Sequence, residues 1–166
     1  MAVGGTKSAD LAGRLGDGMI GTGAEPSLLA AFDRAGGAGK PRYGELTVCW
    51  AKDEAAAKKL AKEHWPTSAM ESNLSWELPL PEHFEAVAEP VTEEHVAESV
   101  TCGPDPEEHL SAIRKYAKAG YGHICIHQVG KDQKGFFEFY ADAILPTLRS
   151  VLTPPRKKKE PRARAR

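Results

Sequence analysis

Gly4 and Gly5, near the start of the chain, are by type and position the residues best suited to bind an anion. They follow the small apolar pair Ala2-Val3, which fits a buried strand, and precede a helix that Thr6 or Ser8 can cap. Glycine lets the backbone turn sharply and brings bare N–H groups close to a ligand. At such a helix N-terminus the free N–H groups and the helix dipole point the same way, which favours phosphate binding. A plain turn is the alternative, since no Gly-x-Gly-x-x-Gly follows a full strand.

Two histidines on one expected strand, His123 and His127, suggest a metal site by residue type. At ~3.3 Å per residue they lie roughly 13 Å apart along the strand, too far to share one ion. His127, nearer the carboxyl end, is a candidate for lining a pocket, with a packed or capping histidine as the alternative. The three cysteines have no metal-type spacing, so we expect no metal ligands. Cys49 and Cys125 lie in apolar runs, which predicts buried thiols.

The elements that must position these residues alternate between strand and helix. Residues 1–23 predict a strand, a short helix and a second strand, which ends at the turn Gly21-Thr22-Gly23. Successive units of this kind form a parallel sheet with right-handed crossovers, and ligands bind at the carboxyl ends of its strands. The alternation therefore predicts the α/β class, and both glycine turns lie at carboxyl ends, where a ligand is expected. Further strands are expected over 45–52 and 122–128, and helices from Glu25, over 53–64, from Asp105 to Gly120 and over 134–149.

Part of the sequence resembles a known family. The resemblance rests on Ala2-Val-Gly-Gly-Thr6 and on Ala9-Asp-Leu-Ala-Gly-Arg-Leu-Gly-Asp-Gly-Met-Ile20, which look like the middle of luciferase-like flavin or deazaflavin oxidoreductases. The most similar branch contains enzymes dependent on the deazaflavin coenzyme F420, the relatives of F420-dependent glucose-6-phosphate dehydrogenase. The similarity continues in Leu46-Thr-Val-Cys-Trp50, Gly103-Pro-Asp-Pro-Glu-Glu108 and Gly120-Tyr-Gly-His-Ile-Cys-Ile-His-Gln128. It covers roughly residues 1 to 149, but only the carboxyl-terminal half of the family's barrel.

The resemblance implies a fold, a reaction and a cofactor site. The fold is four parallel βα units that form the carboxyl-terminal half of a TIM-like (β/α)8 barrel over residues 1–153. The reaction is hydride transfer between coenzyme F420, or alternatively FMN, and a small organic substrate. Carried over residue by residue, the cofactor contacts fall on Val3, Gly4, Gly5, Thr6 and Thr22. The family's proton-transferring residues lie in its first half, so the resemblance assigns no catalytic residue here and implies that the chain alone is inactive.

The resemblance also marks where a substrate pocket is expected to differ. The sugar-phosphate branch has cationic side chains at the positions that match Glu25 and Glu98, and its third cation aligns loosely with Lys134. Two acids in place of cations would repel a phosphate dianion, which argues against glucose 6-phosphate as the substrate. The candidates for the substrate pocket are therefore Glu25, Glu98, His127 and Lys134.

A half-barrel implies a partner. Four strands leave exposed sheet edges, and the first strand is short for a buried one, so we expect a fragment that pairs with a missing amino-terminal half-barrel or forms a homodimer. Residues 66–99 hold four prolines, and no Lys or Arg occurs between Glu63 and Ile113. We expect this segment to form an excursion of short helices over the barrel mouth or against a partner. The alternative function is a non-catalytic half-barrel that binds a phosphorylated cofactor or docks to a partner subunit.

The charge pattern constrains partners and location. Net charge is −1, and no apolar run approaches the roughly twenty residues that span a bilayer, so no membrane association is expected. The absence of a leader and the sparse cysteines favour a cytoplasmic protein. Residues 154–166 hold seven basic residues and one acid, which predicts a disordered tail. Because the tail has no aromatic residues and no folded platform, we do not expect it to bind nucleic acid specifically.

Overall fold

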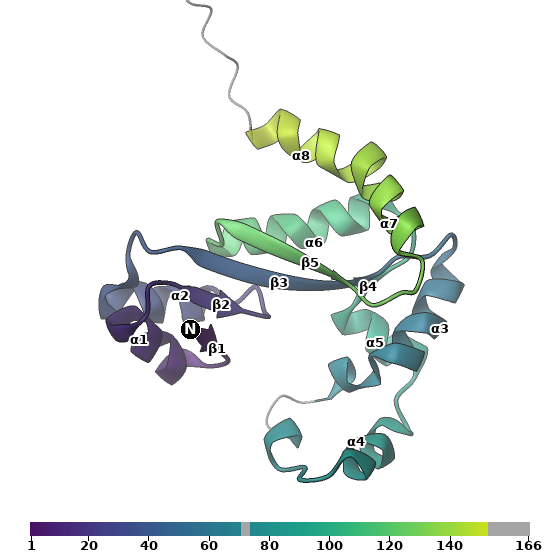
Figure 1. Ribbon diagram of the computed structural model, residues 1–166, viewed down its shortest axis with the longest axis horizontal. Coiled ribbons are helices and arrows are strands. Elements are labelled where there is room, and N and C mark those ends of the chain that lie inside the picture. Colours follow the sequence, from purple (N-terminus) through teal and green to yellow (C-terminus); the bar gives the residue numbers. More distant parts are fainter. Residues whose placement is uncertain (71–73, 153–166) are drawn as a thin grey trace, which may run out of the picture.

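The sheet is built around β3 (Arg42–Cys49) in a computed structural model that describes residues 1–70 and 74–152 (Figure 1). β2 (Met19–Gly21) pairs with it from Met19↔Arg42 to Gly21↔Gly44, and β5 (His123–Gln128) pairs with it from Tyr43↔His123 to Val48↔Gln128. β1 (Ala2–Val3) extends the sheet beyond β2, and β4 (Thr101–Cys102) pairs with β3 past the end of β2. Within the described ranges the sheet thus has five strands, all parallel, which confirms the α/β class.

Helices follow the strands in the expected alternation. Their bounds are α1 Thr6–Leu15, α2 Pro26–Phe32, the π-helical turn η1 Asp33–Gly37, α3 Glu54–His64, the short 3-10 helices η2 Pro66–Ala69 and η3 Leu74–Trp76, α4 Pro81–Ala88, α5 Glu93–Ser99, α6 Pro106–Ala119, α7 Gln133–Phe139, the π-helical turn η4 Tyr140–Ile144 and α8 Leu145–Leu152. In the part of the chain that the structure describes, no helix combines the length and apolar character needed to cross a bilayer.

Both ends of one strand differ from the prediction. The third strand begins at Arg42, three residues before the expected Glu45, and ends at Cys49, three residues before the expected Lys52. The Arg42 guanidinium lies 2.8 Å from the Asp33 carboxylate, so a charged residue is held at the start of a central strand. This ion pair joins β3 to the helical turn that contains Asp33, so the residue pattern of the strand alone does not predict it.

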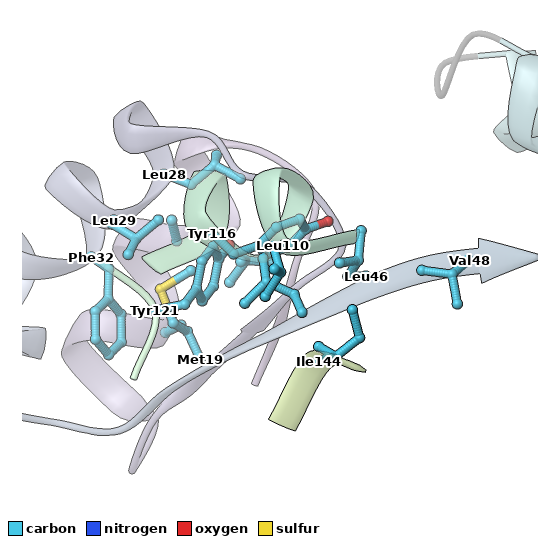
Figure 2. Close-up of a cluster of buried hydrophobic side chains, with 14 of the residues drawn as sticks. Met19, Leu28, Leu29, Phe32, Leu46, Val48, Leu110, Tyr116, Tyr121 and Ile144 are labelled. Carbon is cyan, nitrogen blue, oxygen red and sulfur yellow. The ribbon is translucent and has the colours of Figure 1, made fainter. Parts of the chain in front are cut away.

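One face of the sheet packs on α2, α6 and the helix that contains η4. Leu46 and Val48 of β3 are buried on this face with Tyr116 of α6 and Ile144 of η4 (Figure 2). Gly44 is required here by space, because a Cβ would lie 2.6 Å from the Tyr116 ring. The core therefore lies between the sheet and its helices, as in one side of a βα barrel wall.

The opposite face of the sheet is more open. Side chains alternate along a strand, so this face carries the residues between Gly44, Leu46 and Val48 and their partners on β5. Ile20 is 48% and Tyr43 42% exposed, and the Tyr43 ring stacks on His123 with centroids 4.7 Å apart. Cys125 is exposed on β5, so the prediction that it is buried is wrong, because its apolar neighbours Ile124 and Ile126 face the other side.

The segment 66–99 forms the short helices that its composition predicts. α5 packs through Val96 in a small second core with Val100, Ala61 and Cys49. α4 has no buried residue, and Trp76 in η3 is 87% exposed. Figure 1 shows α4 lying away from the sheet. The predicted basic tail, residues 154–166, lies outside the described residues.

Candidate functional site

The first glycine turn joins the carboxyl end of β1 to α1, as the sequence predicts. Val3 is buried at the end of β1, and Gly4 and Gly5 lead directly into Thr6. A Cβ added at Gly4 or Gly5 would meet no atom within 4 Å, and neither glycine has a positive φ. Neither packing nor backbone conformation therefore requires glycine here, and the open space above the turn would admit a ligand close to the backbone.

Ser8 changes the hydrogen bonding expected at this turn. The N–H groups of Gly4 and Gly5 both donate to Ser8 Oγ at 3.2 Å, and the Ser8 hydroxyl donates to Gly5 O at 2.9 Å. These two N–H groups are thus not bare, in contrast to the expectation. A ligand would meet the first N–H groups of α1 itself, since no acidic side chain lies in the first turn of that helix.

The second glycine turn lies beside the first. Val3 pairs with Gly21, so both strands end at the same edge of the sheet and exposed Thr22 follows directly. Two tyrosines hold the turn from the helix side. The Tyr116 hydroxyl lies 2.8 Å from Thr22 O and 2.8 Å from Glu45 O, and the Tyr121 hydroxyl donates to Gly23 O at 3.0 Å.

Burial keeps both of these tyrosines protonated as donors. It raises the pKa of Tyr116 to about 12 and raises the pKa of Tyr121 above its usual value. Their role was missed in the sequence because the contacts join residues far apart in the chain. The local signal for Tyr116 is the apolar stripe that it forms with Leu110 and Ile113 on the helix expected from Asp105 to Gly120.

His127 lies on the open face of the sheet, towards the carboxyl end of β5. Its Nδ1 is 3.8 Å from the Glu45 carboxylate, and its ring lies edge-on to Trp65 with centroids 4.9 Å apart. Nδ1 is shielded from solvent and has no hydrogen-bond partner in the part of the chain that the structure describes. Glu45 was not singled out in the sequence, although its place between Tyr43 and Thr47 on an alternating strand puts it on this face.

The other candidates for the substrate pocket are separated. Glu25 occupies the N-cap position of α2 without a side-chain capping hydrogen bond, and its side chain lies next to Gly23. Glu98 lines a cavity of about 500 Å³ between α3, α5 and α6. Lys134 is 3.7 Å from Glu138 on α7, and its side chain is 87% exposed. Among the described residues no hydrogen bond or ion pair joins any two of Glu25, Glu98, His127 and Lys134.

The carboxyl ends of β3 and β5 are joined by a side chain that the sequence did not reveal. The Trp50 N–H donates to Gln128 Oε1 at 2.8 Å, and Gln128 Nε2 donates to Trp50 O at 3.1 Å. The amide side chain thus continues the β3–β5 hydrogen bonding beyond the last backbone pair. Over the described ranges, no group of three His, Cys, Asp or Glu side chains is placed to hold a metal ion.

Comparison with known proteins gives matches over most of this chain, which correspond to about half the length of each relative. The chain is 33% identical over 164 residues to the F420-dependent glucose-6-phosphate dehydrogenase of Beutenbergia cavernae, covering 90% of this chain and 48% of that protein. It is 29% identical over 163 residues to the enzyme of the same name from Kribbella flavida, covering 91% and 48%. The chain thus spans about half the length of the curated relatives it matches. No model of a protein family matches it.

Solved structures share the fold. An F420-dependent secondary alcohol dehydrogenase in complex with an F420-acetone adduct superposes with a TM-score of 0.72 at 20% identity, covering 87% of this chain and 47% of the other. The coenzyme F420-dependent tetrahydromethanopterin reductase of Methanopyrus kandleri gives 0.60 at 16% identity, covering 89% and 50%. At these identities the likeness concerns the fold, and again it extends over half of the larger protein.

Proposed function

The chain is related in sequence and in fold to F420-dependent luciferase-like oxidoreductases, of which it spans about half, and we propose that it supplies the part of such an enzyme that cradles the coenzyme. Bound F420 would carry the hydride to or from a small organic substrate. The residues assigned to the cradle are Val3, Gly4, Gly5, Thr6 and Thr22. They come from two turns that the β1–β2 register places side by side.

The open turn at Gly4 and Gly5 is the observation that carries this proposal. Both glycines face free space, although among the described residues neither a neighbouring atom nor a positive φ requires glycine there. A phosphate in that space would meet the N-terminus of α1, where unpaired N–H groups and the helix dipole favour an anion. Thr22 directly follows Gly21, whose strand partner Val3 ends β1, so Thr22 lies at the same edge of the sheet as Gly4.

We expect the substrate to lack a phosphate dianion. Glu25 lies against the second glycine turn, and Glu98 and Lys134 line different cavities. The cluster of cations that would hold a sugar phosphate is therefore not assembled by these positions. FMN is the alternative cofactor, and a half-barrel that binds a cofactor without turnover is the alternative function.

The proposal includes a second half-barrel. The outer edges of β1 and β5 are unpaired among the described strands, and the face with Ile20 and Tyr43 is open to solvent. A (β/α)8 barrel closes both edges and buries that face. The relatives are about twice as long as this chain, so a partner half of similar size would complete the barrel.

Titration of the purified chain with F420 and, separately, with FMN tests the cofactor assignment. Fluorescence would report binding, and Gly5→Val would fill the space above the turn. We expect this variant to weaken F420 binding at least tenfold. Gly122→Val is the matched control, because a Cβ at Gly122 also meets no atom within 4 Å and its φ is not positive. Equal affinity in the two variants would show that the ligand does not bind at the Gly4-Gly5 turn. If the folded chain bound neither cofactor, the half-barrel would not form a cofactor site on its own, and the proposal would be wrong for this chain.

A further inference from the structure

A groove of about 440 Å³ runs between α1 and the α2–η1 helix, next to the first glycine turn. It is lined by Thr6, Lys7, Asp10 and Arg14 of α1, by Ala31 of α2 and by Arg34 of η1. This volume falls within the roughly 300–1,000 Å³ of small-molecule sites. The groove shares only Thr6 with the cofactor cradle and has no role in the function proposed above.

The charges in the groove are unbalanced. It contains three cationic side chains and one carboxylate. The carboxylate of Asp10 is already paired with Arg14 at 2.6 Å. Lys7 and Arg34 are exposed and, among the described residues, have no ion-pair partner. Two cationic side chains from different helices therefore face the groove without a counter-charge.

The backbone adds to this positive potential. The N–H groups of Thr6 and Lys7 belong to the first turn of α1, and they precede the first helical hydrogen bond, which Ala9 N–H makes to Gly5 O. No side chain of the described residues caps them. α1 has ten residues, so its dipole contributes a partial positive charge at this end.

Helix packing fixes the groove in place. α1 and the α2–η1 helix meet closely at Gly13, where a Cβ would lie 2.8 Å from Ala35 Cβ. The same region is tied by Lys40, whose Nζ donates to Gly13 O at 2.7 Å. The small side chain of Ala31 leaves the space between the helices open. The cations are therefore held on two helices that are fixed relative to each other, and not on a mobile loop.

We propose that this groove binds an extended polyanion, a chain that carries two or more phosphate or carboxylate groups. The first anionic group lies at the α1 N-terminus, and the next lies between Lys7 and Arg34. Such a chain can be a free molecule, or it can be the anionic extension of the ligand at the Gly4-Gly5 turn, and this second source rests on the proposed function. A single phosphate would engage only part of the groove and bind more weakly.

Titration of the intact chain with tripolyphosphate at low ionic strength, followed by calorimetry, tests the proposal. We expect saturable binding that is tighter than that of inorganic phosphate and that weakens as salt is added. The double variant Lys7→Glu/Arg34→Glu is expected to weaken tripolyphosphate binding by about tenfold or more. The matched control is Lys59→Glu/Lys118→Glu, which makes the same change in net charge on α3 and α6. Both lysines are exposed and have no ion-pair partner within the described ranges.

The outcomes separate this proposal from the function proposed above. Loss of tripolyphosphate binding in the groove variant alone supports the groove, even if the chain binds no F420. Loss of both tripolyphosphate and F420 binding identifies the anionic part of the cofactor as the source, whereas loss of tripolyphosphate alone identifies a free polyanion. Equal loss in the two double variants, or equal affinity for phosphate and tripolyphosphate, would overturn the proposal, because net charge alone would then explain the binding.

Discussion

His109 shows how a single residue links three elements. It is fully buried, its Nε2 lies 3.0 Å from Gly103 O, and its Nδ1 lies 2.9 Å from the Tyr140 hydroxyl. A carbonyl only accepts, so Nε2 carries the proton and Nδ1 accepts from Tyr140. The neutral ring is thus satisfied on both sides, and it ties the start of α6 to η4. Nothing in the sequence distinguished this histidine from exposed ones, because its partners are 6 and 31 residues away.

Acid should destabilise the fold through His109. Burial lowers its pKa below 6.5, so the unfolded chain binds the proton first, and stability is lost as pH falls below about 6.5 towards the folded pKa. Urea unfolding between neutral and mildly acidic pH measures this loss, whose slope for one proton is at most about 1.4 kcal/mol per pH unit. We expect His109→Gln to be less stable at neutral pH but to show a shallower dependence on pH. His83→Gln, at a half-buried position, should keep the full slope, and an unchanged slope in His109→Gln would contradict this account.

At the scale of elements, the contact between α6 and β3 holds the second glycine turn. Tyr116 reaches across the sheet edge to Thr22 O and Glu45 O, and it can do so because Gly44 leaves room for its ring. The alternation of Leu46, Val48 and their neighbours could be predicted from sequence, because it is local. The tyrosine contacts could not, since they depend on how α6 lies on the sheet.

Gly44→Ala tests this contact. The added Cβ would lie 2.6 Å from the Tyr116 ring and 3.1 Å from Tyr121, so we expect a loss of about 1–3 kcal/mol in the free energy of unfolding. Gly122→Ala serves as the control, because its Cβ faces open space and should change stability by less than about 1 kcal/mol. Urea unfolding of both variants measures the difference. If Gly44→Ala were as stable as Gly122→Ala, the ring would have to be free to move, and the turn would not depend on it.

At the scale of the whole molecule, one face of the sheet is covered by helices and the other is open to solvent. This difference explains which predictions from the sequence were confirmed. The parallel sheet, the βα order and the turns at carboxyl ends followed from local periodicity and glycine positions. The exposure of Cys125 was missed because burial depends on which face the helices cover. The substrate candidates were chosen by position along the sequence, which does not show that Glu98 on α5 and Lys134 on α7 line different cavities.

The open sheet face should drive association. Ile20 and Tyr43 are exposed there, so we expect mass by light scattering to rise with concentration or on addition of a complementary half-barrel. Ile20→Asp places a charge in this face and should reduce association about tenfold. Phe137→Asp removes a comparably exposed apolar side chain from α7 and should leave association unchanged. A chain that stays monomeric at all concentrations and ignores the added half would refute the prediction.

The position of β3 in the sheet has a consequence for how the molecule opens. Because β2, β4 and β5 all pair with it, most of its amide protons can exchange with solvent only when neighbouring strands separate. α4 has no buried residue, so its amides are released by local opening. Deuterium should therefore label α4 early and β3 last. The two glycine turns, tied to β3 through β2 and Tyr116, would keep their geometry while α4 is already open.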